Sequence, residues 1–222
     1  MIPRSSNRFF APRAAAALLL AALLGAGGAV QAAPDDKFLA AFNRFKEAAA
    51  GDADAVAGAS DAFGALLKSE PGNPVLLAYV GATTSMRART TLIPWKKLSY
   101  AEDGLAQIDK ALALAAATPN LPAQRGTPGA LELKYVAAST MLVVPGFMNR
   151  GARGAKLLGE VLDSPAFAAA PAGFRGEVLL RAGELAVEQK RTPEARRYLG
   201  EVIAMGAPQT ETAKAKLREV AP

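Results

Sequence analysis

The sequence predicts an all-α protein, and three observations lead to this prediction. Hydrophobic residues make up 51% of the chain, but alanine dominates that share and aromatic residues reach only 6%. Apolar residues recur at intervals of three and four, as on one face of a helix, whereas the long Val/Ile/Thr alternations typical of strands are absent. Breaks that contain Pro or Gly separate these segments. We therefore expect antiparallel helix pairs joined by short turns.

The first 32 residues are typical of a secretory signal peptide. Basic and polar residues precede an apolar run over 14–24, and small residues follow it. Val30 and Ala32 occupy the −3 and −1 positions, so we expect cleavage after Ala32; a retained membrane anchor is the alternative. The remaining chain, 33–222, is expected to form one domain in a bacterial periplasm or outside the cell. Its apolar segments are too short for a membrane span.

Four helices are expected in the first half of the exported chain, over about 35–50, 52–69, 75–91 and 99–117. Phenylalanines spaced by three and four give the first helix an apolar stripe. Asp52 is placed to cap the second helix, and Pro74 suits the first turn of the third. Ser99 and Glu102 are expected to form a capping box at the start of the fourth.

Five further helices are expected, over about 128–144, 152–163, 171–189, 192–205 and from 208 onwards. Prolines stand at or near four of these starts, where the missing backbone N–H costs nothing. Pro145-Gly146 ends the first of the five. The last helix is mostly polar, as expected of a terminal cap on a stack of helices.

A recurring spacing of small and bulky residues predicts how the helices stack. Gly183, Ala195, Leu199 and Pro208 resemble the small–small–bulky–Pro spacing of the 34-residue tetratricopeptide repeat. The residues 59–71 repeat the second half of this pattern. A further copy begins at Gly81, but its second glycine is Gly104, so an insertion of about eleven residues spans 88–100. We expect a short tetratricopeptide-repeat-like α-solenoid, with a compact Ala-rich helical bundle as the alternative.

The exported chain also resembles a group of exported bacterial tetratricopeptide-repeat-like proteins. The residues that carry this resemblance are AYVGATTSMRARTTLIPWKKLSYAEDGLAQIDKALAL (78–114) and, more loosely, LVVPGFMNR (142–150). The resemblance implies a helix with a basic end, a Pro-Trp-Lys-Lys turn and a Gly-Leu…Asp-Lys-Ala helix. It brings no reaction or ligand with it, so it bears on fold and compartment only.

The composition removes several kinds of chemistry. The chain has no histidine and no cysteine, which excludes disulfides, thiol nucleophiles, imidazole bases and the usual zinc ligands. The acidic residues Glu102, Asp103 and Asp109 are not spaced like a catalytic pair, and we expect Asp109 to pair with Lys110. Without the first 32 residues the chain carries 23 basic and 20 acidic residues, which is too even for a nucleic-acid-binding surface. We expect no enzyme, no cofactor, no metal and no nucleic-acid partner.

Two candidate binding regions remain. The first combines aromatic rings with cations, which suits recognition of carboxylates or phosphates: Arg87, Arg89, Trp95, Lys96, Lys97 and Tyr100. Alternatively, Trp95 fills a gap between two helices, and Arg87 and Lys97 are solvated or pair with the acidic residues at 102–103. The second region contains Phe147, Met148, Asn149 and Arg150. Phe147 and Met148 either contact a peptide or simply cover the end of the preceding helix.

These observations predict a non-catalytic periplasmic adaptor or scaffold that binds an envelope protein or peptide on its helical surface. A binding protein for a small anionic ligand, held in a cleft by the same cations and rings, is the alternative. An open groove would favour the first function and a closed pocket the second.

Overall fold

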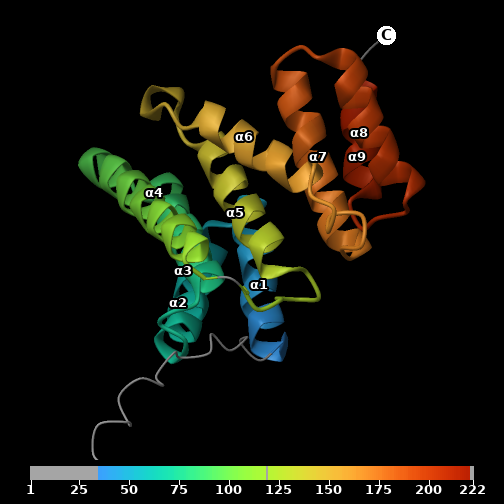
Figure 1. Ribbon diagram of the computed structural model, residues 1–222. Helices are drawn as coiled ribbons and strands as arrows, with labels where there is room; N and C mark the ends of the chain where they lie inside the picture. The colour runs from blue at the N-terminus through green and yellow to red at the C-terminus, as the bar shows by residue number, and fades with distance from the viewer. Residues whose placement is uncertain (1–34, 119, 221–222) are drawn as a thin grey trace, which may run out of the picture.

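The computed structural model describes residues 35–118 and 120–220, so the predicted signal peptide lies outside the described residues. The described part is helical and contains no strand, which confirms the all-α prediction (Figure 1). Its elements are α1 (Asp35–Ala49), α2 (Ala53–Ser69), α3 (Pro74–Thr90), α4 (Pro94–Ala116), α5 (Gly129–Val143), the 3-10 helix η1 (Gly146–Met148), α6 (Gly151–Leu162), α7 (Ala172–Glu188), α8 (Thr192–Ala204) and α9 (Thr210–Glu219). No helix in these ranges is long and apolar enough to cross a membrane.

Helices pack mainly against their neighbours in the chain. The most extensive contacts join α1 with α2, α2 with α3, α3 with α4, α5 with α6, and α7 with α8. Further contacts join helices two apart, such as α3 with α5 and α7 with α9. The chain therefore advances across the molecule from α1 and α2 to the red helices α8 and α9 (Figure 1). This near-neighbour order is how stacked helix pairs build a continuous core.

The caps of α2 and α3 follow from local chemistry. The Asp52 carboxylate accepts hydrogen bonds from the backbone N–H groups of Asp54 (2.9 Å) and Ala55 (3.2 Å), which confirms the predicted cap. Asn73, whose capping role we did not predict, accepts in the same way from Val75 (3.0 Å) and Leu76 (3.3 Å). Both side chains satisfy N–H groups that have no partner inside the helix.

The predicted capping box at Ser99 is wrong. The helix α4 begins at Pro94, five residues earlier, and Ser99 lies inside it with its hydroxyl donating to Asp103 Oδ2 (3.1 Å). Proline at the first helical position has its φ already fixed and lacks only an N–H that would be unpaired anyway. The insertion over 88–100 is therefore not a loop, because it lengthens α3 and α4 and leaves a three-residue turn, Thr91–Ile93, between them.

Glycines set the close approach of paired helices. A Cβ added to Gly81 of α3 would lie 2.7 Å from the carbonyl oxygen of Gly104 and 2.9 Å from Ile108 Cγ1, both on α4. A Cβ added to Gly183 of α7 would lie 2.8 Å from Leu199 Cδ2 on α8. The small and bulky positions singled out in the sequence thus face each other in two different helix pairs.

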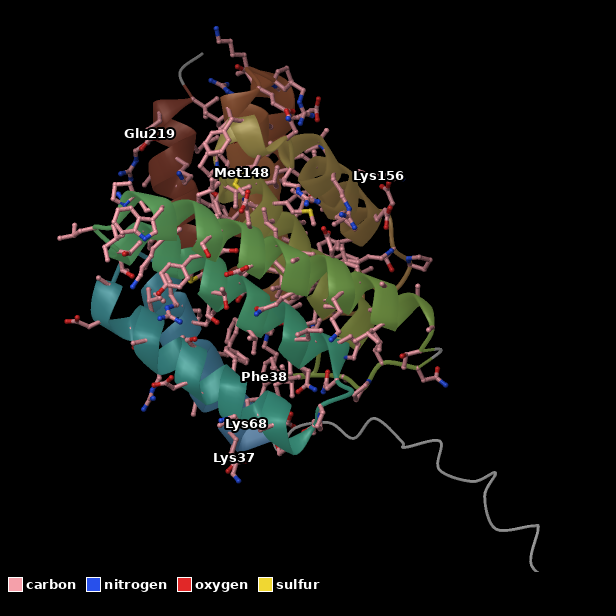
Figure 2. All side chains as sticks on the ribbon, turned by 90° about the vertical axis from the view of Figure 1, so that its left-hand side faces the viewer. Lys37, Phe38, Lys68, Met148, Lys156 and Glu219 are labelled. Carbon is pink, nitrogen blue, oxygen red and sulfur yellow. The ribbon has the colours of Figure 1, made fainter. Side chains whose placement is uncertain are left out.

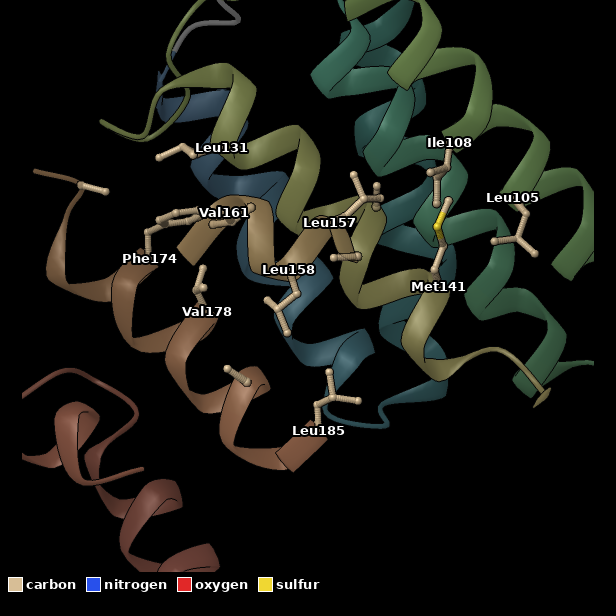
Figure 3. Packing of buried hydrophobic residues seen from close by; sticks show 14 residues of the cluster. Leu105, Ile108, Leu131, Met141, Leu157, Leu158, Val161, Phe174, Val178 and Leu185 are labelled. Carbon is tan, nitrogen blue, oxygen red and sulfur yellow. The ribbon is translucent and has the colours of Figure 1, made fainter. Parts of the chain in front are cut away.

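The core continues through three hydrophobic clusters along the chain. The first contains stacked and edge-to-face rings from α1, α2 and α3, including Phe63 and Tyr79, whose centroids are 4.3 Å apart. Figure 3 shows the second, in which Met141 of α5 points toward Ile108 of α4 while Phe174 and Val178 extend it into α7. The third joins α7, α8 and α9. Ala-rich helices thus bury one connected interior rather than separate cores.

Candidate functional site

A cleft of about 710 Å³ lies between the first helices and α5, and it is the best candidate for a binding site in the described part of the chain. Its wall comes from elements that are distant in sequence: Phe42, Phe45 and Lys46 of α1; Tyr79, Ala82, Met86 and Arg89 of α3; Pro94, Lys97, Leu98 and Ala101 of α4; Tyr135, Thr140 and Val143 of α5; Phe147 and Met148 of η1; and Glu177 and Gln209 beyond them. Most of this surface is apolar. A cleft of this size and lining suits a small molecule or a few residues of a peptide.

The charged groups of the cleft are mostly positive. Lys46, Arg89 and Lys97 line it, and none of the three forms an ion pair with a carboxylate among the described residues. Arg89 is partly fixed, because its guanidinium donates to the backbone oxygen of Ala48 (3.1 Å). The one lining carboxylate, Glu177, already binds Arg125 (2.8 Å). The cleft therefore favours an anionic group on whatever binds there.

A buried polar cluster lies behind the cleft, and two of its residues, Tyr79 and Glu177, also line the cleft. Arg125 binds Glu132 (3.0 Å) and Glu177 (2.8 Å), and its guanidinium lies 4.0 Å from the centre of the Phe42 ring. Glu132 is fully buried and also accepts a hydrogen bond from the Tyr79 hydroxyl. Burial raises the pKa of the Glu132 carboxyl above its ordinary value, and the charge of Arg125 opposes this rise. The cluster thus holds α3, α5 and α7 together behind the cleft.

The backbone at Arg125 has an unusual conformation. Its φ is +44°, and Gly126 follows at +73°. The two residues form a tight turn closed by reciprocal backbone hydrogen bonds between Gln124 and Thr127 (2.8 and 2.9 Å). A positive φ is uncommon for an arginine, and the paired carboxylates stabilise the turn that requires it.

The first candidate region is brought together only in part. Lys97 and Arg89 line the cleft, whereas Trp95 and Lys96, in the first turn of α4, are exposed outside it. Arg87 stacks on the Tyr100 ring (4.5 Å to its centre) and donates to the Tyr100 hydroxyl (3.1 Å).

The structure excludes one of the two interpretations of Trp95. Its side chain is 74% exposed, so it does not fill a gap between helices. Arg87 and Lys97 are both exposed to solvent, as one of the two expectations for them had it. Arg87 does not pair with the acidic residues at 102–103, because it bonds Tyr100 and Asp103 accepts from Ser99. The aromatic ring at 100 thus takes the place of a carboxylate as the partner of Arg87.

The second candidate region divides in the same way. Phe147 and Met148 both line the cleft, but Phe147 is 72% exposed, whereas Met148 also packs against the second hydrophobic cluster and covers the end of α5. Asn149 ends η1 in the left-handed conformation (φ +53°) and donates to the backbone oxygen of Phe147 (3.3 Å). Arg150 binds Asp109 of α4 (3.0 Å). Asp109 therefore pairs with Arg150 and Arg153, and not with Lys110 as expected.

Sequence reasoning missed Arg125, Glu132 and Glu177. Only one signal was present: Glu132 lies between Leu131 and Leu133 in a mostly apolar helix, where a buried carboxylate needs a partner. The rest of the cluster could not be read from the pattern, because Tyr79 is 53 residues from Glu132 in the chain and Glu177 is 52 residues from Arg125.

Fold and site together define a class, an all-helical protein of stacked helix pairs with a mostly apolar, cation-bearing cleft. Compared with models of known protein families, with curated proteins and with solved structures, the chain gives no significant match. The similarity to tetratricopeptide-repeat proteins therefore stays a prediction from the sequence.

Proposed function

We propose that this protein is a non-catalytic, periplasmic adaptor or scaffold that binds a segment of an envelope protein in the cleft. The observation that carries the proposal is the combination of a mostly apolar wall with three cations that lack carboxylate partners among the described residues. An apolar wall binds apolar side chains of many shapes, because hydrophobic contact has no directional requirement. The cations favour a segment that also carries Asp or Glu. Tetratricopeptide-repeat-like stacks commonly hold extended peptides in this way.

A second candidate function is supported by the size of the cleft. A volume of about 710 Å³ lies within the range of small-ligand sites. The same lining would accept an amphipathic anion, with its hydrocarbon part against the apolar wall and its carboxylate near Lys46 or Lys97. The protein would then be a small-ligand-binding protein of the cell envelope.

Peptide selection on the immobilised protein tests the first function directly. Random displayed peptides should be enriched for sequences that combine large apolar residues with Asp or Glu. A synthetic peptide of the selected sequence, labelled with a fluorophore, then gives the affinity by anisotropy. The variant Lys46→Glu/Lys97→Glu should weaken binding at least tenfold, because each substitution replaces an attraction by a repulsion.

A matched control separates the cleft from overall charge. Lys37→Glu/Lys68→Glu makes the same change in net charge with two exposed lysines that do not line the cleft. Figure 2 shows Lys37 and Lys68 together at the edge of the molecule far from Met148. Binding should change by less than about twofold in this control. Equal losses in both variants would contradict the proposal, and competition by palmitate instead of peptides would favour the small-ligand function.

A further inference from the structure

Two large apolar side chains project where α3 meets α4, one from the turn between them and one from the first turn of α4. Leu92 is 92% exposed and Trp95 is 74% exposed, and neither lines the cleft. With Lys96 beside them they form the docking tip, a name that we use below for Leu92, Trp95 and Lys96. Large apolar groups exposed close together are typical of a contact surface, because leaving them in water costs free energy.

The chain segment that forms the docking tip carries only positive charges. No Asp or Glu occurs between Ser85 and Ala101, a stretch that contains Arg87, Arg89, Lys96 and Lys97. Lys96 is exposed and forms no ion pair with a described residue. The tip thus presents apolar groups and uncompensated cations together.

A second projection also exposes large apolar side chains. Phe147 is 72% exposed and Val143 is 66% exposed at the connection between α5 and α6. Its basic neighbours are mostly paired, because Arg150 and Arg153 bind Asp109 and Lys134 binds Glu160, so the second projection contributes apolar contact and little net charge. Both projections lie at the upper left of Figure 1, and residues next to each of them, Pro94 and Met148, line the same cleft. One end of the molecule therefore carries both exposed apolar groups.

We infer that this end docks on an anionic phospholipid surface. Trp95 and Leu92 enter the interfacial layer, where an indole ring with its N–H is well accommodated. Lys96, with the neighbouring cations, lies near the lipid phosphates. A membrane accepts projecting side chains without a complementary pocket, whereas a protein partner needs one to enclose Trp95. The inference goes beyond the proposed function and does not depend on it, since the docking tip lies outside the cleft lining.

Vesicles test the inference with the protein's own fluorescence. Trp95 is the only tryptophan of the chain, so its emission reports the docking tip wherever else the chain touches lipid. We expect a blue shift and quenching by brominated acyl chains with vesicles that contain phosphatidylglycerol. Vesicles of phosphatidylcholine alone should bind more than tenfold more weakly, and added salt should weaken binding to the anionic ones.

Matched variants distinguish docking at the tip from a general electrostatic attraction between the protein and anionic vesicles. Lys96→Glu should weaken binding roughly tenfold to thirtyfold, since each charge near an anionic surface contributes about fivefold. Leu92→Ser, which keeps the reporter, should weaken it about tenfold. Lys68→Glu, an exposed lysine at the far edge in Figure 2, should change it less than about twofold.

Three results would overturn the inference. The first is an unshifted Trp95 emission with anionic vesicles. The second is an equal loss in Lys68→Glu and Lys96→Glu. The third is a blue shift that grows with protein concentration in the absence of lipid, which would show that a second copy of the chain covers the tip. Peptide binding in the cleft is measured separately and can survive any of these results.

Discussion

Arg125 lies between two carboxylates and over an aromatic ring, at a point where three helices meet. Arg125 binds Glu132 (3.0 Å) and Glu177 (2.8 Å). Among the described residues, no other cation lies within ion-pair distance of either carboxylate. A buried ion pair contributes little net stability compared with apolar groups of the same shape, but removing one partner is expensive. Arg125 is thus important mainly because its removal would leave the carboxylates of Glu132 and Glu177 without a counter-ion.

We predict that Arg125→Met destabilises the protein by about 3–5 kcal/mol at neutral pH, because Glu132 remains charged and buried. Methionine keeps the apolar contact with the Phe42 ring, so the loss measures the charge. Urea unfolding followed by circular dichroism gives the free energy of unfolding. The loss should shrink as the pH falls, since burial already raises the pKa of Glu132 and the neutral carboxyl costs less to bury.

Arg197→Met is the matched control for this substitution. Arg197 also lies over an aromatic ring, that of Tyr198 (4.2 Å), and also binds a carboxylate, that of Glu201 (3.2 Å), but it is exposed. The expected loss is below about 1 kcal/mol. Similar losses for the two variants would contradict the role that we give to burial.

At the scale of helices, local chemistry predicts starts and ends well where one residue decides them. Asp52 and Pro74 satisfy or avoid unpaired N–H groups on their own, and both helices begin there. Ser99 fails as a predicted cap because Pro94 offers an earlier start and the longer helix gains backbone hydrogen bonds. Two good local signals five residues apart compete, and the packing of α4 against α3 decides between them.

The pairing of α3 with α4 depends on Gly81, and this can be tested. Gly81→Ala should destabilise the protein by about 1–3 kcal/mol, because the added methyl group would meet the backbone oxygen of Gly104 at 2.7 Å. Backbone cannot move aside as a flexible side chain can. The shift of the urea midpoint at constant slope measures the effect.

Gly159→Ala on α6 is the control for helix propensity. Its added methyl group would meet nothing within 4 Å, so the higher helix propensity of alanine should stabilise the protein by about 0.5–1 kcal/mol. Opposite signs for the two substitutions are expected. A stabilising Gly81→Ala would mean that α3 and α4 are farther apart than described.

For the whole molecule, the fold class follows from composition and periodicity, but the cleft does not. Helical spacing reports which face of each helix is apolar, and that information is local. The cleft needs α1, α3, α5 and α7 in their final places, and its support at Glu177 depends on a partner 52 residues away in the chain. The exposure of Trp95 likewise depends on the direction in which the connection between α3 and α4 projects, and the sequence does not predict that direction.

The order of helix contacts predicts how a local defect spreads, and this separates a solenoid from a compact bundle. Leu199 is fully buried against α7, so Leu199→Ala should cost about 2–5 kcal/mol. In a stack held by near neighbours, amide hydrogen exchange should accelerate in α7, α8 and α9 and change little in α1 and α2. Val56→Ala in α2 should give the reverse pattern. Acceleration throughout the chain in both variants would instead show one cooperative bundle, because every helix would then open with every other.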